Sequence, residues 1–193
     1  MKESYVQDSI RESITVKENI LKSKKALRQL HDLAKLMENC ILNGNKIILA
    51  GNGGSAADCQ HIAAEFTSRF EFNRAPLAAV ALTTDTSALT AIGNDYGYEN
   101  VFSRQLMSLA SEGDVFIGIT TSGMSPNIAK CASICAEKKV YSVLLTSTKA
   151  SSVEDWNEVF KVPSSNTARI QESHILIGHL LCGLVERAIF KNE

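Results

Sequence analysis

The sequence predicts an α/β fold: a doubly wound, five-stranded parallel sheet flanked by helices and preceded by a long helical segment. Short apolar runs alternate with longer segments of helical periodicity, a pattern typical of parallel sheets. Polar loops follow two of these runs, and such sheets bind ligands beyond the carboxyl ends of their strands. The chain has 193 residues, so we expect a single domain over residues 1–193.

The first expected element is the N-terminal helical segment, residues 1–43. Residues 5–42 contain no proline or glycine, and their apolar residues recur at helical spacing. One long helix or two consecutive helices fit this pattern. The segment has more apolar positions than packing on one sheet needs, so we expect a helix of another subunit to cover some of them.

From residue 46 onward, strands and helices are expected to alternate. The expected strands cover residues 46–51, 77–82, 114–120, 140–146 and 159–162. The expected helices run from the loop at 51–55 to about residue 70 and over 85–92, 100–111, 127–138 and 167–191. A turn is expected at residues 93–97, and a Ser/Asn/Thr cluster before residue 167 suits helix capping.

Composition is that of an ordinary soluble globular protein, with 45% hydrophobic residues, 21% charged residues and a net charge of −1. Lysine and arginine are spread along the chain, and no apolar run reaches the roughly 20 residues that span a bilayer. We therefore expect neither a nucleic-acid nor a membrane partner. Without a signal-peptide pattern at the N-terminus, a cytoplasmic location is expected. The five cysteines are expected to be buried, reduced thiols.

Two loops have the chemistry of an anion site. The glycine loop, residues 51–55 (GNGGS), allows close backbone approach to a ligand and leads into a helix N-terminus. The hydroxyl loop, residues 120–125 (TTSGMS), offers four hydroxyl groups before another helix. Neither loop contains the lysine of a P-loop, and GNGGSA lacks the spacing of a dinucleotide fingerprint. The two loops are expected to hold one phosphate jointly, although each could also be a simple helix cap.

Two helices carry candidate metal ligands. His61 and Glu65 are four residues apart and therefore project from one helix face. Gln171 and His179 are eight apart, which keeps them roughly on one side of the terminal helix. These side chains offer nitrogen and oxygen ligands suited to zinc, and Glu65 and His179 are candidates for proton transfer. A surface ion pair explains the first spacing equally well, so spacing alone leaves both interpretations open.

Four segments together resemble the bacterial phosphoheptose isomerases, compact sugar isomerase (SIS) domain proteins. They are GNGGSAADCQHIAAEF, ALTTDTSALTAIGNDYGYENVFSRQ, GDVFIGITTSGMSPN and TARIQESHILIGHLLC. The resemblance implies an aldose–ketose isomerase that converts D-sedoheptulose 7-phosphate to D-glycero-D-manno-heptose 7-phosphate through an enediol. That step leads to activated heptose for lipopolysaccharide, capsule or S-layer glycan. The resemblance also implies a homotetramer with active sites between subunits.

The resemblance also implies roles for individual residues. The implied phosphate contacts are Ser55, Thr120, Thr121, Ser122 and Ser125. Further substrate contacts are implied for Asn52, Gly53, Gly54, Glu65, Asn94, Asp95 and Gln171. The implied ligands of one zinc ion per subunit are His61, Glu65, Gln171 and His179. Glu65 and His179 form the implied catalytic pair. A carboxylate held tightly by zinc is a poorer base, so either Glu65 leaves the metal during turnover or the metal mainly positions the sugar.

Two positions depart from many relatives. Thr120 stands where many have serine, which keeps the hydroxyl group, and Ala168 stands where some have an aspartate. The alternative function is a non-catalytic SIS-domain tetramer that binds the replication initiator DnaA. That relative lacks the residues matching Glu65 and His179, and both are present here.

Overall fold

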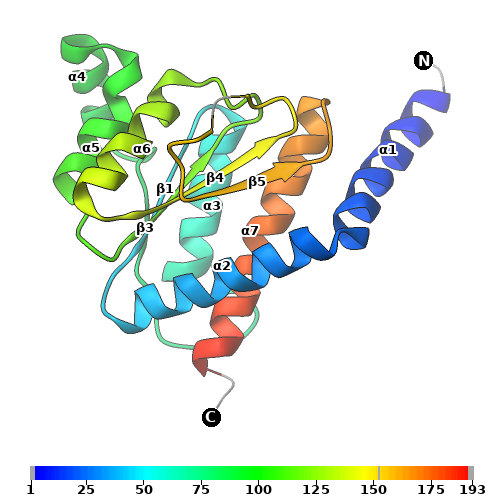
Figure 1. The fold of residues 1–193 in the computed structure, drawn as a ribbon, viewed down its shortest axis with the longest axis horizontal. Coiled ribbons are helices and arrows are strands. Elements are labelled where there is room, and N and C mark those ends of the chain that lie inside the picture. The colour runs from blue at the N-terminus through cyan, green and yellow to red at the C-terminus, as the bar shows by residue number, and fades with distance from the viewer. Residues whose placement is uncertain (1–2, 152, 191–193) are drawn as a thin grey trace.

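The computed structural model describes residues 3–151 and 153–190 and confirms the predicted sheet. Five parallel strands form one sheet in the order β2-β1-β3-β4-β5 (Figure 1). The strands are β1 (Ile47–Gly51), β2 (Ala79–Ala81), β3 (Val115–Ile119), β4 (Tyr141–Ser147) and β5 (Glu158–Val162). The order reverses direction at β1, which places a switch point between β1 and β3.

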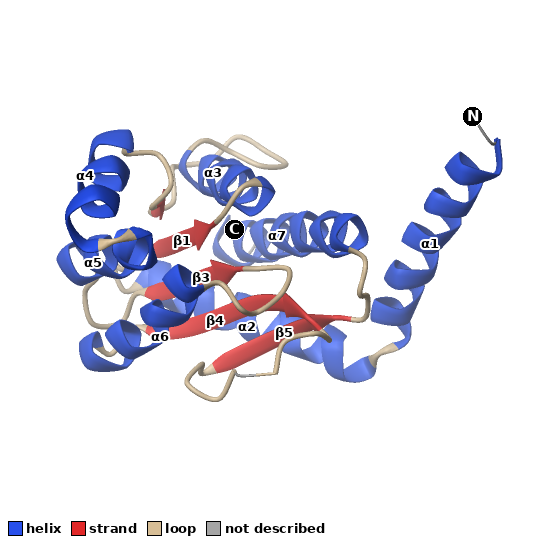
Figure 2. Cartoon of the chain, turned by 90° about the horizontal axis from the view of Figure 1, so that it is seen from above, coloured by secondary structure: helices blue, strands red, loops and turns tan. Residues whose placement is uncertain are grey.

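Helices cover both faces of this sheet, as a doubly wound fold requires (Figure 2). They are α1 (Glu3–Lys22), α2 (Lys24–Leu42), α3 (Gly54–Thr67), α4 (Thr86–Tyr96), α5 (Val101–Leu109), α6 (Pro126–Lys138) and α7 (Thr167–Phe190), with a short 3-10 turn η1 (Tyr98–Asn100). Side chains of α2, α3 and α7 form one apolar core with the sheet, and side chains of α5 and α6 form the other. The carboxyl ends of the strands stay free for the loops that follow them.

The N-terminal segment forms two consecutive helices and not one long helix, the other arrangement that the sequence allowed. Ser23 separates them, because its hydroxyl accepts a hydrogen bond from the Ala26 N–H at 3.2 Å and so caps α2. Helix α1 extends away from the sheet (Figure 1). Its last turns are anchored by buried Val16 and Ile20, whereas Ile10, one of its more distal apolar residues, is 56% exposed.

The expected turn at residues 93–97 is wrong, because α4 continues through Tyr96. The Asp85 side chain caps the start of this helix by accepting from the Ala88 N–H at 2.9 Å. The helix ends at Gly97, whose φ of +85° is a left-handed conformation that favours glycine. Gly93 is tolerated inside the helix, so glycine alone misplaced the boundary. The other elements lie close to their expected bounds, except that α3 ends at Thr67, and residue 191 lies outside the described residues.

Helix α7 is long and apolar enough, by length and composition, to cross a membrane. Half of its apolar stretch is nevertheless buried inside the molecule, as in the core helix of a globular domain. It also carries His174 and Glu186, whose side chains are fully buried and hydrogen-bonded. We therefore describe α7 as a core helix that fixes functional side chains against the sheet.

Candidate functional site

The parallel register brings the two predicted anion loops to one edge of the sheet. Gly51 at the end of β1 pairs with Ile119 at the end of β3. The glycine loop and the hydroxyl loop therefore begin at neighbouring strand ends. Two hydrogen bonds also connect these regions, because the side-chain amides of Asn52 and Asn127 bond reciprocally at 2.9 and 2.8 Å. Asn127 lies in the first turn of α6, directly after the hydroxyl loop.

The glycine loop has a backbone that only glycine readily adopts. A Cβ on Gly51 would lie 2.7 Å from the carbonyl oxygen of Ser55, so the loop closes directly on α3. Gly53 precedes the helix with a φ of +56°. Ser55 lies in the first turn of α3 with only 3% of its surface exposed. This arrangement directs a helix N-terminus and a hydroxyl group toward the edge of the sheet where an anion would bind.

The hydroxyl loop is held by its own hydrogen bonds. Thr120 and Ser125 lie with their hydroxyl oxygens 3.0 Å apart, and the Ser122 hydroxyl accepts from the Met124 N–H at 3.1 Å. The Ser147 hydroxyl donates to the carbonyl of Thr121 at 2.7 Å and so ties the loop to β4. The structure thus brings together two of the hydroxyl groups expected to share one phosphate, those of Thr120 and Ser125.

A second cluster forms between α3 and α7. The Nε2 atoms of His61 and His179 lie 2.8 Å apart, and Glu65 Oε1 lies 3.4 Å from His61 Nε2. One ligand atom from each of the three side chains lies within 4.8 Å of the other two. The side chains are partly exposed, His61 to 48% and Glu65 to 22%. The convergence of two imidazoles and a carboxylate could hold a metal ion, since a His₂Glu donor set is one that zinc accepts.

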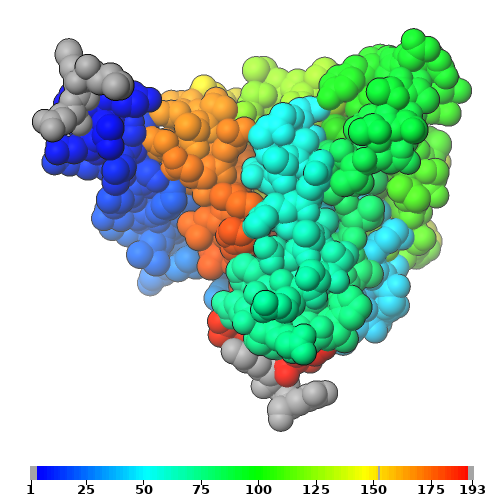
Figure 3. Space-filling view, turned by 180° about the vertical axis from the view of Figure 1, so that it is seen from behind, coloured from blue at the N-terminus to red at the C-terminus, as the bar shows by residue number. Residues whose placement is uncertain are grey.

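Close packing of α3 against α7 creates this cluster, and Figure 3 shows the two helices side by side on one face. A Cβ on Gly178 would lie only 2.4 Å from Cδ1 of Ile62. The absence of a side chain at Gly178 therefore lets the helices approach at the residues next to His61 and His179. Phe70 then stacks on the His179 ring, with centroids 5.5 Å apart and planes at 18°.

Asp58 lies near this cluster and was missed from the sequence. It lies one helical turn before His61, and its Oδ2 is buried without a hydrogen-bond partner among the described residues. Burial raises the pKa of this carboxyl, while the nearby imidazoles of His61 and His179 oppose that change. An unpaired buried oxygen beside two imidazoles and a carboxylate fits a site for positive charge. The spacing 58, 61, 65 is the signal that would have found it.

A buried ion pair between Arg74 and Glu186 fixes the carboxyl end of α3. The sequence analysis did not predict it. Arg74 donates from Nε to Glu186 Oε1 at 2.9 Å and from a terminal nitrogen to the carbonyl of Glu65 at 2.7 Å. The side chains of Arg74 and Glu186 are 2% and 0% exposed. Burial raises the pKa of Glu186, but hydrogen bonds from the backbone N–H groups of Glu71 and Phe70 and from the Arg74 side chain outweigh it and hold this pKa below its usual value. The pair joins the turn that carries Glu65 to α7.

The remaining expected residues lie in three places. Gln171 lies against the glycine loop, since a Cβ on Gly54 would be 2.6 Å from its Nε2. Asn94 and Asp95 lie in the exposed last turn of α4 and hydrogen-bond to each other at 2.7 Å. Ala168 is exposed at the start of α7, where its N–H donates to the Asn166 side chain. Gln171 is thus placed beside the glycine loop, at the start of α3.

Comparison with known proteins identifies relatives over the whole length. Residues 10–147 match the SIS domain family. A phosphoheptose isomerase of Aneurinibacillus thermoaerophilus is 56% identical over 190 residues, covering 98% of this chain and 96% of that protein. The solved structure of phosphoheptose isomerase GmhA from Neisseria gonorrhoeae superimposes with a TM-score of 0.86 at 43% identity, covering 95% of this chain and 98% of that one. The solved structure of a phosphoheptose isomerase from Francisella tularensis superimposes with a TM-score of 0.90 at 33% identity, covering 97% of this chain and 100% of that one.

Proposed function

The chain belongs to the phosphoheptose isomerases of the SIS-domain family, and on that premise we propose that it interconverts D-sedoheptulose 7-phosphate and D-glycero-D-manno-heptose 7-phosphate. The observation that carries the proposal is the meeting of Glu65 and His179, from two helices, on the part of α3 that runs back from the sheet edge where both anion loops begin. His61 lies seven residues, roughly 10 Å of helix, beyond Gly54. This separation suits a sugar whose phosphate and carbonyl are at opposite ends.

At the phosphate end, we assign binding to backbone and hydroxyl groups. The proposed phosphate ligands are Ser55, Thr120, Thr121, Ser122 and Ser125. The N-terminus of α3 adds its free N–H groups and dipole. Asn52, Gly53 and Gly54 line the same site, and Asn94, Asp95 and Gln171 are the proposed further sugar contacts. Binding energy from the phosphate orients the reacting carbons at the other end.

At the reacting end, the proposed chemistry is proton transfer between two carbons. Glu65 removes a proton from C1, the electron pair of that C–H bond forms the C1–C2 double bond, and the π pair of the C2 carbonyl moves to its oxygen, which takes a proton from His179 to give the enediol. In the second half the C1 hydroxyl returns a proton to His179, its electron pair forms the C1 carbonyl, and the C1–C2 π pair takes the proton held by Glu65 at C2. Arg74, through the Glu65 carbonyl, holds the backbone of the base, and Phe70 sets the plane of the imidazole.

Zinc is the metal that we propose for the cluster. His61, Glu65 and His179 would hold it, with Gln171 as the fourth ligand. When bound, such an ion polarises the sugar carbonyl as a Lewis acid. Because a coordinated carboxylate is a weaker base, we propose that Glu65 acts as base when its oxygen is free of the metal.

We further propose that the 193 residues form one SIS domain that assembles as a homotetramer. The exposed apolar residues of α1 support this assembly. They are Tyr5, Val6, Ile10, Ile14 and Leu21. All five cysteines are free and buried, which fits the reducing cytoplasm that we propose as its location. The product would enter activated-heptose synthesis for lipopolysaccharide or capsule.

The alternative function, a non-catalytic tetramer that binds the replication initiator DnaA, is not favoured. Several relatives at 46–56% identity over at least 96% of this chain are named phosphoheptose isomerase. The carboxylate and imidazole that catalysis needs are both present and adjacent.

The function is tested by incubating the purified protein with sedoheptulose 7-phosphate and following heptose 7-phosphate by NMR. We expect conversion to an equilibrium mixture, and a chelator should slow it if zinc takes part. A parallel pull-down with the initiator protein should capture nothing. Absence of conversion in both metal-loaded and chelated samples would contradict the proposal.

A further inference from the structure

The cavity between η1 and the start of α6 contains a hydrogen-bonded arrangement that the assignments above do not use. It has a volume of about 330 Å³ and is lined by Asn52, Tyr98, Glu99, Ser125, Pro126 and Asn127. Asn52 and Ser125 belong to the proposed substrate site, so this cavity is continuous with it. Tyr98 and Asn127 have no role in the proposed chemistry, although both bond to the Asn52 side chain.

Counting hydrogen bonds shows what Asn52 can still offer. A carboxamide has two N–H donors and an oxygen with two acceptor positions. The oxygen of Asn52 accepts from Asn127 Nδ2 at 2.8 Å and from the Tyr98 hydroxyl at 3.1 Å, so both acceptor positions are used. One N–H donates to Asn127 Oδ1 at 2.9 Å. Among the described residues, nothing accepts a hydrogen bond from the second N–H of Asn52. The reciprocal pair with Asn127 uses the N–H that lies on the same side as the Asn52 carbonyl oxygen, so the second N–H points away from Asn127.

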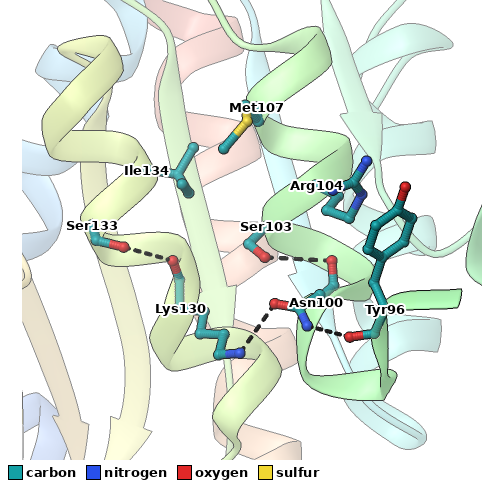
Figure 4. A pocket seen from close by; sticks show the side chains of 8 residues that line it. All are labelled: Tyr96, Asn100, Ser103, Arg104, Met107, Lys130, Ser133 and Ile134. Carbon is teal, nitrogen blue, oxygen red and sulfur yellow. Dashed lines mark hydrogen bonds between the residues drawn. The ribbon is translucent and has the colours of Figure 1, made fainter. Parts of the chain in front are cut away.

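Of the two partners of Asn52, Asn127 is buried, whereas Tyr98 is 62% exposed on a turn that is fastened to the neighbouring helices. Asn127 is 2% exposed in the first turn of α6, so its amide has little freedom to turn. Tyr98 belongs to η1, and Figure 4 shows how the end of that turn is fastened to α6 and α4. Lys130 donates to Asn100 Oδ1 at 3.0 Å, and Asn100 donates to the carbonyl of Tyr96. Lys130 also lies 3.7 Å from a carboxylate oxygen of Glu99.

We propose that Tyr98 and Asn127 are positioning residues that fix Asn52 as a hydrogen-bond donor, and that this donor reads an acceptor oxygen of the sugar chain near its phosphate. The inference deepens the proposed function and rests on it. Ser125 lines the same cavity, which places the recognised oxygen beside the phosphate and away from the reacting carbons. The cavity therefore selects sugar phosphates over inorganic phosphate, because inorganic phosphate has no sugar chain and so places no oxygen next to Asn52.

The test is Tyr98→Phe, which removes the hydroxyl and keeps the ring. We expect KM for sedoheptulose 7-phosphate to rise about 3- to 10-fold, the effect of losing one hydrogen bond. The kcat value should stay within about 2-fold, since the reacting end is untouched. Inhibition by inorganic phosphate should keep its wild-type constant. Tyr141→Phe, at the amino end of β4 on the opposite edge of the sheet, is the matched control and should leave all three values unchanged.

A double-mutant cycle separates an indirect role from a direct one. In an Asn52→Ala background, Tyr98→Phe should not raise KM further, because Tyr98 acts through Asn52. An additional increase equal to that in the wild type would mean that Tyr98 contacts the sugar itself, and would overturn the inference. An unchanged KM in the single variant, or an equal rise in KM and in the phosphate inhibition constant, would overturn it as well.

The two proposals fail differently. A wild-type protein that turns over no sedoheptulose 7-phosphate overturns the proposed function and this inference together. Wild-type turnover combined with a wild-type KM in Tyr98→Phe overturns this inference alone. The melting temperature of each variant is measured as well. Where a variant melts at the wild-type temperature, its change in KM is due to altered recognition and not to unfolding.

Discussion

The proposed site has two ends, the anion loops and the His61–Glu65–His179 cluster, and the fold builds them differently. Each anion loop is a local structure, in which one strand end, a few glycines or hydroxyls and one helix N-terminus provide the chemistry. The cluster joins side chains 118 residues apart, and it exists because α3 and α7 pack closely at Gly178. Binding groups can therefore be changed locally, whereas the reacting groups depend on how two helices pack.

The difference predicts that the two ends can be damaged independently. A change in the loops should weaken binding and leave the chemical step nearly intact. A change in the cluster or its packing should slow the chemical step and leave phosphate binding intact. Glu65→Gln, Gly178→Ala and Ser55→Ala test this separation, and His174→Gln tests the packing of α7 on the sheet.

Glu65→Gln should have the largest effect. Amide replaces the proposed base without changing its shape, so kcat should fall by about 10³-fold or more. The variant should still bind sugar phosphate, measured by calorimetry. Glu112→Gln, an exposed glutamate before β3, is the control and should behave as wild type. Near-normal turnover by Glu65→Gln would remove Glu65 from the role of base.

Gly178→Ala tests the packing directly. The added methyl group would lie 2.4 Å from Ile62 Cδ1, so either the buried Ile62 side chain turns or α3 and α7 move apart, and we expect a movement that separates His61 from His179. We expect kcat to fall by up to about 10²-fold, as small misplacements of catalytic groups do. Phosphate affinity should be kept. Gly183→Ala, in the same helix, meets Phe70 only at 3.4 Å and is the matched control.

Rescue makes this prediction stricter. Ile62→Ala removes the two side-chain atoms that lie closest to the new methyl group. The double variant Gly178→Ala/Ile62→Ala should therefore recover part of the lost kcat. If the double variant were slower than both single variants, the close helix contact would not be the cause.

His174 ties α7 to β4, and its burial predicts a pH effect on stability. Its Nε2–H donates to the Thr146 carbonyl of β4 at 3.1 Å, and burial lowers its pKa to about 4. Between pH 4 and 6.5 the unfolded chain binds more protons at this residue, so its contribution is complete above pH 6.5 and is lost as the pH falls. At pH 5 the loss should be about 2 kcal/mol.

Urea unfolding at pH 7.5 and pH 5, with chelator present, measures this loss. His174→Gln should lose about 2 kcal/mol less than wild type between the two pH values. His31→Gln, an exposed histidine on α2, should follow the wild type. Equal pH dependence in wild type and His174→Gln would show that other groups cause it.

Ser55→Ala should have the smallest effect and the opposite kinetic pattern to Glu65→Gln. Loss of one hydroxyl from the phosphate site should cost about 1–2 kcal/mol of binding, which raises KM several-fold. The kcat value should change little, because the cluster is unaltered. Ser133→Ala, exposed on α6, is the control. A large fall in kcat with unchanged KM would mean that the two ends are not separable.

The same difference explains how much could be predicted from sequence. The glycine loop and the His61–Glu65 spacing are local patterns, and they predicted an anion site and a metal-ligand face, of which the structure shows the cluster of His61, Glu65 and His179. Residue types already suggested His61 and His179 as ligands of one zinc site, but spacing alone left this open because no local rule joins α3 to α7, and the family resemblance then implied it. Phe70, Arg74 and Glu186 carried no sequence signal, because their roles arise from tertiary packing. Gly93 misled the prediction, since a glycine inside α4 looks the same in sequence as one that ends a helix.

The most direct test of a two-ended site is turnover of sedoheptulose without its phosphate, alone and with added phosphite dianion. The account predicts that kcat/KM falls by about 10³-fold or more without the phosphate, and that phosphite binding at the loops restores part of it. Ser55→Ala should weaken this activation, and Glu65→Gln should abolish turnover with either substrate. Equal turnover of the free sugar and its phosphate ester, or phosphite that inhibits without activating, would contradict it.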